Sequence, residues 1–500
     1  MDLYRTFRAR STNWRNLLDP ATGFFRARRN GGLLQPFDPY EVNFNFTEAN
    51  AWQYSHFPPQ DFHLLSGERL TYGIHPLAFL DSVFAASSVT SGRDQADITG
   101  LIGQYAHGNE PSHHMAYLYT DLGLSERTRT LVRRILNEQY HDAPDGLSGN
   151  EDCGQMSAWY VMSALGIYQT APGDPVYTLG YPLFKSARVD VGRESPFTVL
   201  VSDSTWALLE AGEDASGPPV VGDREPGLRV MNERSPYNTH STIRFDRDRV
   251  PEERVEVLRT EDWKRPPQPN PVAPFIQARS MAFRDSLHIE LLGHGSNTAT
   301  VTIATAKDTM THPYSGPFAI HSTAAISAAV KGAPVSNAVF TRIDDDRTIT
   351  LESTYANQYA AGGPNALVDG LHGGNDFRTG EWQGFQGQDL VATVDLGAVR
   401  TVDRIGIGLL QDQKSWVFLP TEVTVAWSTN KRQWSSSTIT HTVDPKAEGG
   451  IATELWTEAL GKKARYISIV ATSFGPCPDW HPGKGGSTWI FADEVLIEVR

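Results

Sequence analysis

Hydrophobic positions change their spacing about one third of the way along the chain. Up to residue 172, apolar residues recur at helical spacing, and Gly- and Pro-containing loops between them collect the polar residues. The pattern predicts helices over 1–18, 73–90, 112–122, 125–140 with Ser125 as N-cap, and 154–168 closed by Gly166. Helices joined by such loops are typical of a helical barrel whose active site lies on its loops.

After residue 175 the apolar positions alternate with period two. Strands are predicted over 177–184, 187–191, 197–201 and 240–245, followed by a Pro-rich linker at 264–274. Alternating segments at 286–292, 299–305, 317–322 and 324–330 predict a small all-β unit. From about 347 to 500, the length and strand spacing predict a β-sandwich or jelly roll.

Composition narrows the class of protein. The 500 residues are 40% hydrophobic, which excludes wholesale disorder and predicts about three domains. A net charge of −14 argues against nucleic acid as a partner and suits a neutral or cationic ligand or a metal ion. Cys153 and Cys477 lie too far apart for a disulfide framework, and the sequence contains no membrane-spanning apolar run. The charged, amphipathic opening residues do not predict a signal peptide.

Three polar clusters stand out in the helical part, at 47–54 with Asp61, at 107–114 and at 149–155. Each places carboxylates beside amides and aromatic rings just before a helix. There, one carboxylate can stay ionised at a helix N-terminus, and another can keep its proton in an apolar setting. Glycosidic hydrolysis needs such a pair, and aromatic rings suit the apolar faces of sugars. A single cluster of this kind is more often a capping loop.

Other chemistries lack their motifs. The sequence has no G-x-S-x-G, H-E-x-x-H, P-loop or C-x-x-C pattern. The adjacent His113 and His114 would point about 100° apart on a helix, so we expect one buried and one surface histidine rather than a zinc pair. Cys153 is expected to be a small packed residue rather than a nucleophile.

Three long motifs carry a family resemblance. TEANAWQY, GQYAHGNEPSHHMAYLY and DGLSGNEDCGQMSAWYVMSALGIYQTAPG, together with GFFRARRNGGLLQPFDP, resemble the calcium-dependent exo-acting α-mannosidases of glycoside hydrolase family 92. The resemblance covers residues 1–260 and implies part of an (α/α)6 barrel with a β extension. It further implies inversion of configuration and a Ca²⁺ ion that contacts the mannose 2- and 3-hydroxyls.

The resemblance also implies roles for individual residues. Glu48 matches the general acid, and Asp152 matches the general base that activates water. Asn109 and Glu110 fall where calcium and substrate contacts gather, and they supply the oxygen ligands a hard cation takes. The matches to substrate-binding positions are Trp52, Gln53, Asp61, His113 and Glu151.

The chain departs from the family pattern at Ala49, where the family has Gly, and at Gln60, where it has His. Family members carry a β-sandwich domain and half of the barrel before these motifs, so we expect a C-terminal portion of a longer enzyme. The helix predicted at residue 1 without a capping signal agrees with that expectation. The family implies a secreted or periplasmic protein that acts on mannose-containing N-glycans or mannan.

Two further resemblances follow the linker. Residues 275–346 resemble the small β domain at the C-terminus of chitobiases, with a spacer role. Residues 350–500 resemble the discoidin, or factor 5/8 type C, fold that includes family 32 carbohydrate-binding modules. This second resemblance implies a structural calcium ion, for which the candidates are Asp369, Asp376 and Glu494. Trp416, Trp480 and His481 lie in loops and could contact a glycan.

The sequence thus predicts a calcium-assisted, inverting exo-α-mannosidase with two C-terminal β modules. One alternative is a non-catalytic glycan-binding fragment, since half a barrel would lack part of the sugar pocket. Another is an (α/α)6 hydrolase that acts on glucosides.

Overall fold

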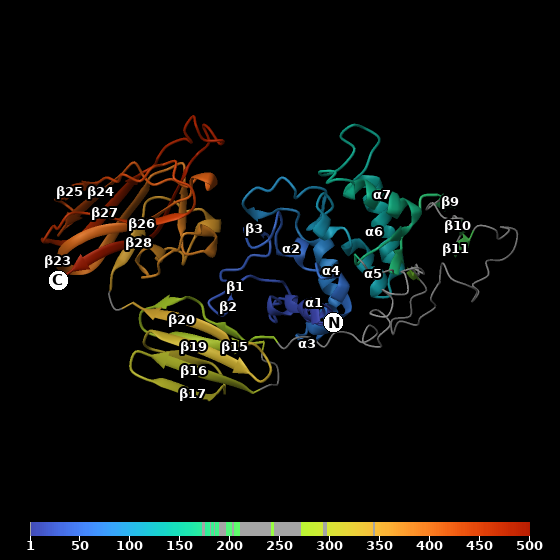
Figure 1. Cartoon of the computed structure of the whole chain (residues 1–500), viewed down its shortest axis with the longest axis horizontal. Coiled ribbons are helices and arrows are strands. Elements are labelled where there is room, and N and C mark those ends of the chain that lie inside the picture. Colours follow the sequence, from blue (N-terminus) through green and yellow to red (C-terminus); the bar gives the residue numbers. More distant parts are fainter. Residues whose placement is uncertain are drawn as a thin grey trace. The chain divides into compact units, whose positions relative to one another are not determined.

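The computed structural model describes residues 2–172, 176–180, 182–184, 186–189, 197–202, 205–210, 242–244, 272–293, 298–343 and 346–500. The chain divides into two compact units (Figure 1), unit 1 with residues 1–27 and 37–271 and unit 2 with residues 28–36 and 272–500. The predicted linker lies largely outside the described residues. Within them, no helix is both long enough and apolar enough to cross a membrane.

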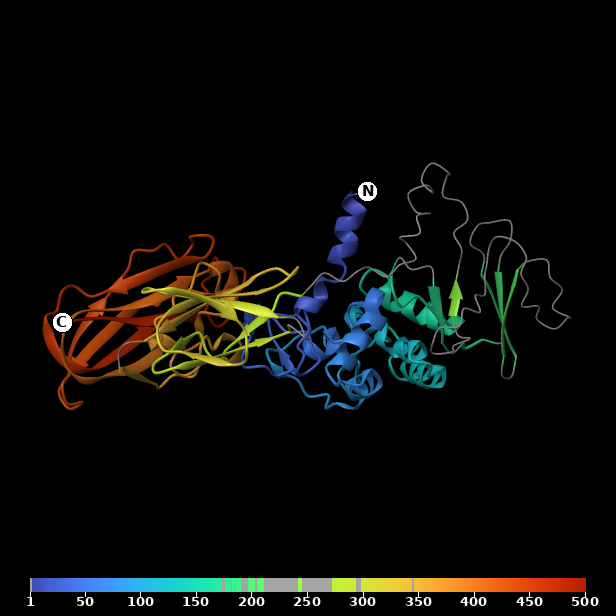
Figure 2. The same ribbon diagram turned by 90° about the horizontal axis from the view of Figure 1, so that it is seen from below.

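Unit 1 is helical up to residue 165. Its α-helices are α1 (Asp2–Arg10), α2 (Ala51–Tyr54), α3 (Phe62–Thr71), α4 (Pro76–Ala85), α5 (Leu118–Asp121), α6 (Ser125–Glu138) and α7 (Gln155–Leu165). Figure 2 shows α1 standing out from the other helices of this unit, and its Leu3 and Phe7 side chains are exposed. The (α/α)6 barrel itself stays a prediction.

Several predicted helix boundaries hold and others change. Gly166 ends α7 with a left-handed φ of 81°, as predicted from the glycine. Ser125 is the first residue of α6, so the predicted N-cap position belongs to Leu124 instead. The predicted helix at 112–122 breaks into two 3-10 turns, Glu110–Ser112 and Met115–Tyr117, followed by the short α5.

Aromatic rings dominate the core of unit 1. Trp159 of α7 is fully buried, and its ring lies 4.5 Å from that of His107 and 6.2 Å from that of Tyr117. Val132 and Ile135 of α6 are buried in the same cluster. The core thus connects α6 and α7 to the second polar loop, residues 107–114. The position of this loop therefore depends on the packing of the two helices.

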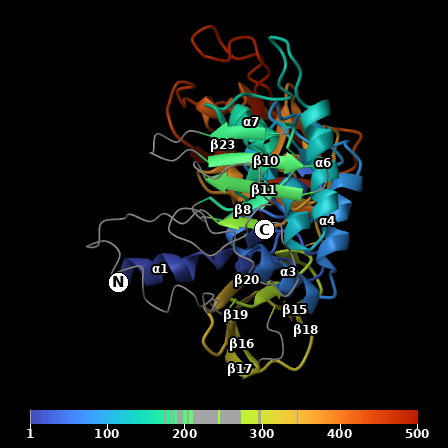
Figure 3. The same ribbon diagram turned by 90° about the vertical axis from the view of Figure 1, so that its right-hand side faces the viewer.

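Short strands complete unit 1. β3 (Glu41–Val42) pairs with β4 (Ser91–Gly92), and β5 (Leu101–Ile102) pairs with β6 (Tyr105–Ala106). Two three-stranded sheets follow the helices. They are β12 (Thr242–Arg244), β8 (Val176–Leu179) and β7 (Ile167–Tyr168), and β11 (Thr205–Glu210), β10 (Phe197–Ser202) and β9 (Ser186–Val189), with β10 and β11 antiparallel in Figure 3. Four of their six strands lie in segments predicted as strands, whereas Ile167–Tyr168 was wrongly predicted as the end of a helix and Thr205–Glu210 was not predicted.

Unit 2 contains a hairpin from residues 28–36, far upstream of the rest of the unit in the sequence. β1 (Arg28–Arg29) pairs with β2 (Gly32–Leu33), and the Arg28 guanidinium donates to the Pro274 carbonyl at 3.0 Å and covers the Phe275 ring at 4.4 Å. A Cβ on Gly31 would lie 2.7 Å from the Asn337 carbonyl, so only glycine fits there. The sequence did not indicate that this segment leaves unit 1.

The small β part of unit 2 contains two sheets. One has the order β13 (Phe275–Gln277), β15 (Leu287–Leu292), β18 (Phe318–Ile320). The other has the order β14 (Ala282–Phe283), β20 (Ser336–Arg342), β19 (Ala324–Val330), β16 (Ala299–Thr305), β17 (Thr309–Pro313). Alternate residues of β16 and β19 are buried, which agrees with the predicted alternation.

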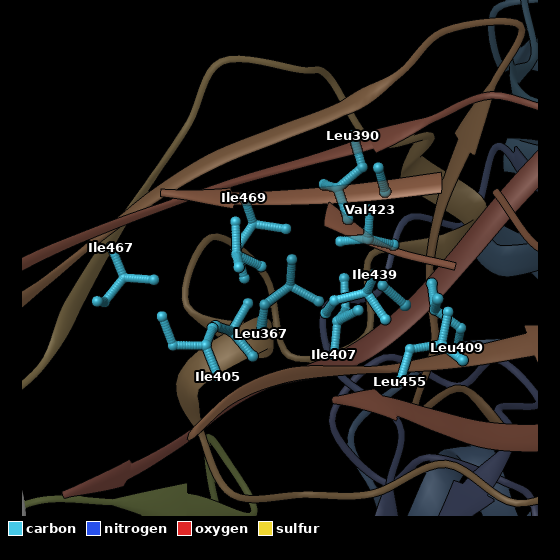
Figure 4. Packing of buried hydrophobic residues seen from close by; sticks show 14 of the residues in the cluster. Leu367, Leu390, Ile405, Ile407, Leu409, Val423, Ile439, Leu455, Ile467 and Ile469 are labelled. Atoms are coloured by element: carbon cyan, nitrogen blue, oxygen red, sulfur yellow. The ribbon is translucent and has the colours of Figure 1, made fainter. Parts of the chain in front are cut away.

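The last part is an eight-stranded assembly, referred to below as the sandwich module. Its strands are β21 (Thr348–Leu351), β22 (Gln383–Gln386), β23 (Leu390–Gln411), β24 (Glu422–Ser428), β25 (Ser435–Ile439), β26 (Ile451–Trp456), β27 (Lys462–Thr472) and β28 (Trp489–Val499). The long β23 pairs with β27, β28, β26 and β21, and Figure 4 shows the core that it lines. In the described residues, these strands pair with none of β13–β20.

Candidate functional site

The second and third polar loops touch through their backbones. A Cβ on Gly149 would lie 2.5 Å from the Gly108 Cα and 2.7 Å from its carbonyl oxygen. Neither neighbour is a flexible side chain, so position 149 requires glycine, whereas a Cβ on Gly108 would first meet the Thr99 side chain. This contact places the segment after Gly108, which holds Asn109 and Glu110, beside the loop that leads to Asp152.

The two predicted catalytic carboxylates stand on strained backbone. Glu48 has φ 56° and Asp152 has φ 52°, in the left-handed region that non-glycine residues seldom adopt. Both side chains are exposed. Residues held in such conformations cost about 1–3 kcal/mol each and gather at active sites, where the surrounding fold imposes them.

Local capping explains where each loop turns. Asn50, two residues after Glu48, is the N-cap of α2 and forms a capping box with Gln53. Gly154, two residues after Asp152, is the N-cap residue of α7 with φ 102°. Each carboxylate is therefore presented immediately before a helix N-terminus, as the sequence predicts.

Glu110 couples the two carboxylates electrostatically. Burial raises the pKa of the Glu110 carboxyl, and the charges of Asp152 and Glu48 and a side-chain hydrogen bond with Asp152 raise it further. Three loops therefore bring Glu48, Glu110 and Asp152 to one site.

Asn109 connects the first loop to the second. Its side chain is buried, its Nδ2 donates to the Glu48 carbonyl at 3.3 Å, and its Oδ1 accepts from the Glu110 amide at 3.1 Å. The amide thus orients the backbone of the predicted acid. The Oδ1 atom keeps a second lone pair that a cation or a hydroxyl group could use.

His113 and His114 are both buried, so the expectation of one surface histidine is wrong. His113 donates from Nε2 to the His107 carbonyl at 2.8 Å, and its Nδ1 accepts from Gln155 at 3.2 Å. Burial lowers the pKa of His113 to about 4, although the Asp152 charge opposes the shift. The 3-10 turns that replace the predicted helix let both rings point inward, where they are neutral.

Two of the predicted sugar-binding residues, Trp52 and Gln53, differ in whether their polar side-chain atoms form hydrogen bonds. Trp52 is buried edge-on to Phe24, and its Nε1 has no hydrogen-bond partner in the described part of the chain. Gln53 uses its Oε1 for the Asn50 amide and its Nε2 for the Gln104 carbonyl. Trp52 therefore retains a free donor, whereas Gln53 holds the first loop in place.

Asp61 and Glu151 are also engaged by the protein. Asp61 accepts from Trp14 Nε1 at 2.9 Å, and burial raises its pKa. Glu151 is exposed and accepts from the Gly154 amide at 2.5 Å at the start of α7. Hydrogen bonds from the Ser157 side chain and then from the Gly154 amide lower the pKa of its carboxyl. Cys153 is exposed with φ 56°, so the expectation that it packs is wrong.

The sandwich module brings together two of its three predicted cation ligands. Glu494 accepts from the amides of Asp369 and Gly370 at 3.1 Å each. Burial raises the pKa of Asp369 to about 7 and that of Glu494 to about 8. Asp376 instead accepts from the Arg378 amide within its own exposed turn.

Sequence reasoning missed Asp493, which joins Asp369 and Glu494. It is buried, it accepts from the Gly373 amide at 2.8 Å, and its Oδ1 has no partner in the described residues. Its position next to Glu494 in the segment Ala492–Asp493–Glu494 was the available signal. In the described residues, no three His, Cys, Asp or Glu side chains are disposed to bind a metal by themselves.

The predicted aromatic loop residues of the sandwich module separate into two kinds. Trp416 is 37% exposed and Trp480 is 40% exposed. Trp416 has φ 65° and packs over Gly483, where a Cβ would lie 2.5 Å from the ring. His481 is buried, donates from Nε2 to the Gln413 carbonyl and accepts at Nδ1 from the Gly483 amide, so it holds the loops rather than facing solvent.

Two family models match parts of this chain. Residues 1–210 match the glycosyl hydrolase family 92 catalytic domain. Residues 348–491 match the F5/8 type C domain. The described architecture agrees in part with these matches, because a helical unit with β extensions precedes an all-β module.

Several known proteins are similar over limited segments. A family 92 α-mannosidase from Bacteroides thetaiotaomicron is 33% identical with a TM-score of 0.34, and the match covers 42% of this chain and 26% of that one. A family 92 inverting mannosidase from the same organism is 30% identical with a TM-score of 0.30, over 44% and 29%. A protein of Arthroderma benhamiae described as an uncharacterised secreted glycosidase is 28% identical, over 16% of this chain and 10% of that protein. The chain therefore spans under a third of each.

Proposed function

We propose, for a chain whose residues 1–210 match the glycosyl hydrolase family 92 catalytic domain, an exo-acting, inverting α-mannosidase activity on terminal α-mannosides of glycans. The observation that carries the proposal is the convergence of Glu48, Glu110 and Asp152 from three loops, with the first and last on strained backbone. Mannose-containing N-glycans or mannan would be the substrates, encountered outside the cell or in the periplasm.

The proposed roles come from the family resemblance of Glu48 and Asp152. Glu48 is the general acid that protonates the glycosidic oxygen as the bond to the sugar breaks. Asp152 is the general base that takes a proton from water as the water attacks the opposite face of the ring, which inverts the anomeric centre. An inverting pair stands about 6.5–9.5 Å apart to admit that water. The touching glycines at 108 and 149 support such a fixed separation.

The supporting residues orient the pair. Neutral His113 receives a hydrogen bond from Gln155, the first residue of α7, and so steadies the helix start that follows Asp152. Asn109 holds the Glu48 carbonyl, and the buried ring of Trp52 packs edge-on to Phe24 and so supports the first loop. Glu151 and Gln53 act through helix capping, as positioning residues.

The second loop fits a hard cation with few protein ligands. The Glu110 carboxylate and Asn109 Oδ1 would hold a Ca²⁺ ion, which takes six to eight oxygen ligands and would use water and sugar hydroxyls for the rest. Burial raises the pKa of Glu110, and the charges of Asp152 and Glu48 raise it further; a bound cation would favour the ionised carboxylate against these effects. When bound, the ion would polarise two neighbouring hydroxyls of the sugar.

The sandwich module is proposed to bind carbohydrate and a structural Ca²⁺ ion. Asp493 and Glu494 are buried and Asp369 is partly buried in the same region, and the unpartnered Oδ1 of Asp493 fits a cation ligand. Trp416 and Trp480 offer exposed rings to a sugar face.

Hydrolysis of α-1,2- and α-1,3-mannobiose tests the proposal. Glu48→Gln and Asp152→Asn should each lower kcat by at least about 100-fold, because each removes a proton-transfer group. Asp142→Asn is the control at an exposed carboxylate outside the three polar clusters and should keep most of the rate. A chelator should abolish activity, and proton NMR should detect β-mannose first. Unchanged rates in both catalytic variants would refute the roles.

One alternative retains glycan binding without hydrolysis. The exposure of Trp416 and Trp480 favours it, because these rings do not depend on the catalytic loops. Mannose bound only at the sandwich module, with no hydrolysis by the wild-type chain, would establish that alternative.

A further inference from the structure

One end of the sandwich module collects its unpaired positive charges. Twelve Lys and Arg lie in residues 348–500, and six of them form ion pairs with acids of the same module. The other six form none among the described residues. Five of these six lie at one end of the module, namely Arg400, Lys431, Arg432, Lys462 and Lys463.

Strand pairing brings these five side chains together. Lys462 and Lys463 begin β27, and Arg400 of β23 pairs with Ala464, the next residue of that strand. Lys431 and Arg432 lie in the turn between β24 and β25, and Ser428 at the end of β24 pairs with Tyr466. Figure 1 shows β24, β25 and β27 side by side. All five cationic side chains are exposed, and we refer to them as the basic end.

Aromatic rings are interleaved with the charges. The Lys431 ammonium lies 4.7 Å from the Tyr466 ring centroid, and the Arg465 guanidinium lies 5.1 Å from it. Trp434, in the same turn, is 40% exposed, and its Nε1 donates to the Lys431 carbonyl. The turn thus presents a ring face next to two cations.

The acids of β23 at this end do not neutralise the basic end. Asp395 accepts a hydrogen bond from Arg465 at 2.8 Å. This hydrogen bond, followed by the charges of Arg465 and Lys431, lowers the pKa of the Asp395 carboxyl. Asp403 bonds Arg500. The positive charge is therefore in excess, although the whole chain carries a net charge of −14.

The basic end is distant from the aromatic loops of Trp416 and Trp480. β27 has eleven residues, and at about 3.3 Å per residue its two ends lie roughly 33 Å apart. The basic end surrounds Lys462, whereas Trp480 lies in the loop after Thr472. A ligand at the basic end would therefore occupy a second, separate surface.

We propose that the basic end binds an anionic polysaccharide, through sulfate, phosphate or carboxylate groups on the sugar chain. Exposed cations attract such groups, and Trp434 can stack on a sugar ring. The choice of a glycan rather than a lipid rests on the proposed function, since the other surfaces of this chain are assigned to glycans. Two surfaces at opposite ends would let the module follow a charged, mannose-bearing polymer.

Binding of the full chain to dextran sulfate, with neutral dextran of equal length as the reference, tests the proposal. We expect dextran sulfate to bind at least tenfold more tightly, with an affinity that falls as salt rises. The double variants Lys431→Gln/Arg432→Gln and Lys462→Gln/Lys463→Gln should each weaken binding by about tenfold and lower the salt slope by about two.

Lys414→Gln/Lys484→Gln is the matched control, because it removes the same charge from lysines that are ion-paired elsewhere in the module. It should leave binding within twofold. An equal loss in the control, or equal binding of dextran and dextran sulfate, would overturn the proposal. So would tighter binding to vesicles of phosphatidylcholine with phosphatidylglycerol, or to duplex DNA. A chain that binds as expected but does not cleave mannosides would retain this inference and refute only the proposed function.

Discussion

Replacing Gly149 by alanine tests whether the contact between two loops sets the catalytic geometry. The added Cβ would lie 2.5 Å from the Gly108 Cα, whereas carbon atoms in ordinary contact are about 3.5–4.0 Å apart. Gly108 cannot retreat freely, because its amide donates to the Thr99 carbonyl at 3.1 Å. The two loops must therefore separate by about 1 Å.

That separation acts on stability and on rate. Overpacking of this kind costs about 1–3 kcal/mol, and a displacement of about 1 Å at a reacting group can cost about 100-fold in rate. Asp152 follows Gly149 by three residues, and Glu110 follows Gly108 by two. Separation of the loops should therefore also weaken the electrostatic interaction between the Glu110 and Asp152 carboxyls. We expect Gly149→Ala to lower kcat on aryl α-mannosides by about 10- to 100-fold.

The assay pairs steady-state hydrolysis with thermal unfolding of wild type and variant. Gly67→Ala is the matched control, because Gly67 lies inside α3, has nothing within 4 Å of its added Cβ and should gain about 0.5–1 kcal/mol from helix propensity. A Gly149→Ala variant with wild-type rate and melting temperature would refute the reasoning that this backbone contact positions the site.

Three other outcomes are expected. Burial lowers the pKa values of the histidines at 107, 113 and 114, so below about pH 6.5 the unfolded chain binds more protons than the folded chain. The melting temperature of unit 1 should therefore fall as the pH drops from about 6.5 to about 4, and a melting temperature that does not change with pH would contradict this. Calcium should raise the melting temperature of the sandwich module. This rise should vanish in Glu494→Gln and persist in Asp376→Asn. Loss of the rise in both variants would show that Asp376 also binds the ion. Trp480→Ala should weaken mannan binding without unfolding, whereas His481→Ala should lower stability by about 1–3 kcal/mol, because it leaves a buried carbonyl without its donor.

Local patterns in the sequence predicted much of this protein correctly. Gly166 ends α7 because a left-handed C-terminal residue is a property of the glycine itself. The strands of the sandwich module follow the period-two pattern, since alternate side chains of a strand face opposite sides. The three polar loops, and the presence of Glu48 and Asp152 before helices, follow from similarly local spacing and capping signals.

Burial and close approach depended on residues far apart in the chain. The contact of Gly108 with Gly149 joins residues 41 positions apart in the chain, and Trp159 of α7 packs against His107 in the same loop as Gly108. Both His113 and His114 are buried because a regular helix gave way to 3-10 turns.

The same distinction explains the cation ligands and the basic end. Asp493, rather than Asp376, joins Glu494, because the loop at Gly373 folds back onto β28. The five unpaired cations meet only through the pairing of β23, β24 and β27. Desolvation and charge at a site depend on all neighbouring residues in space. The sequence pattern therefore gives the residue types, but the tertiary structure decides which residues surround them and shift their pKa values.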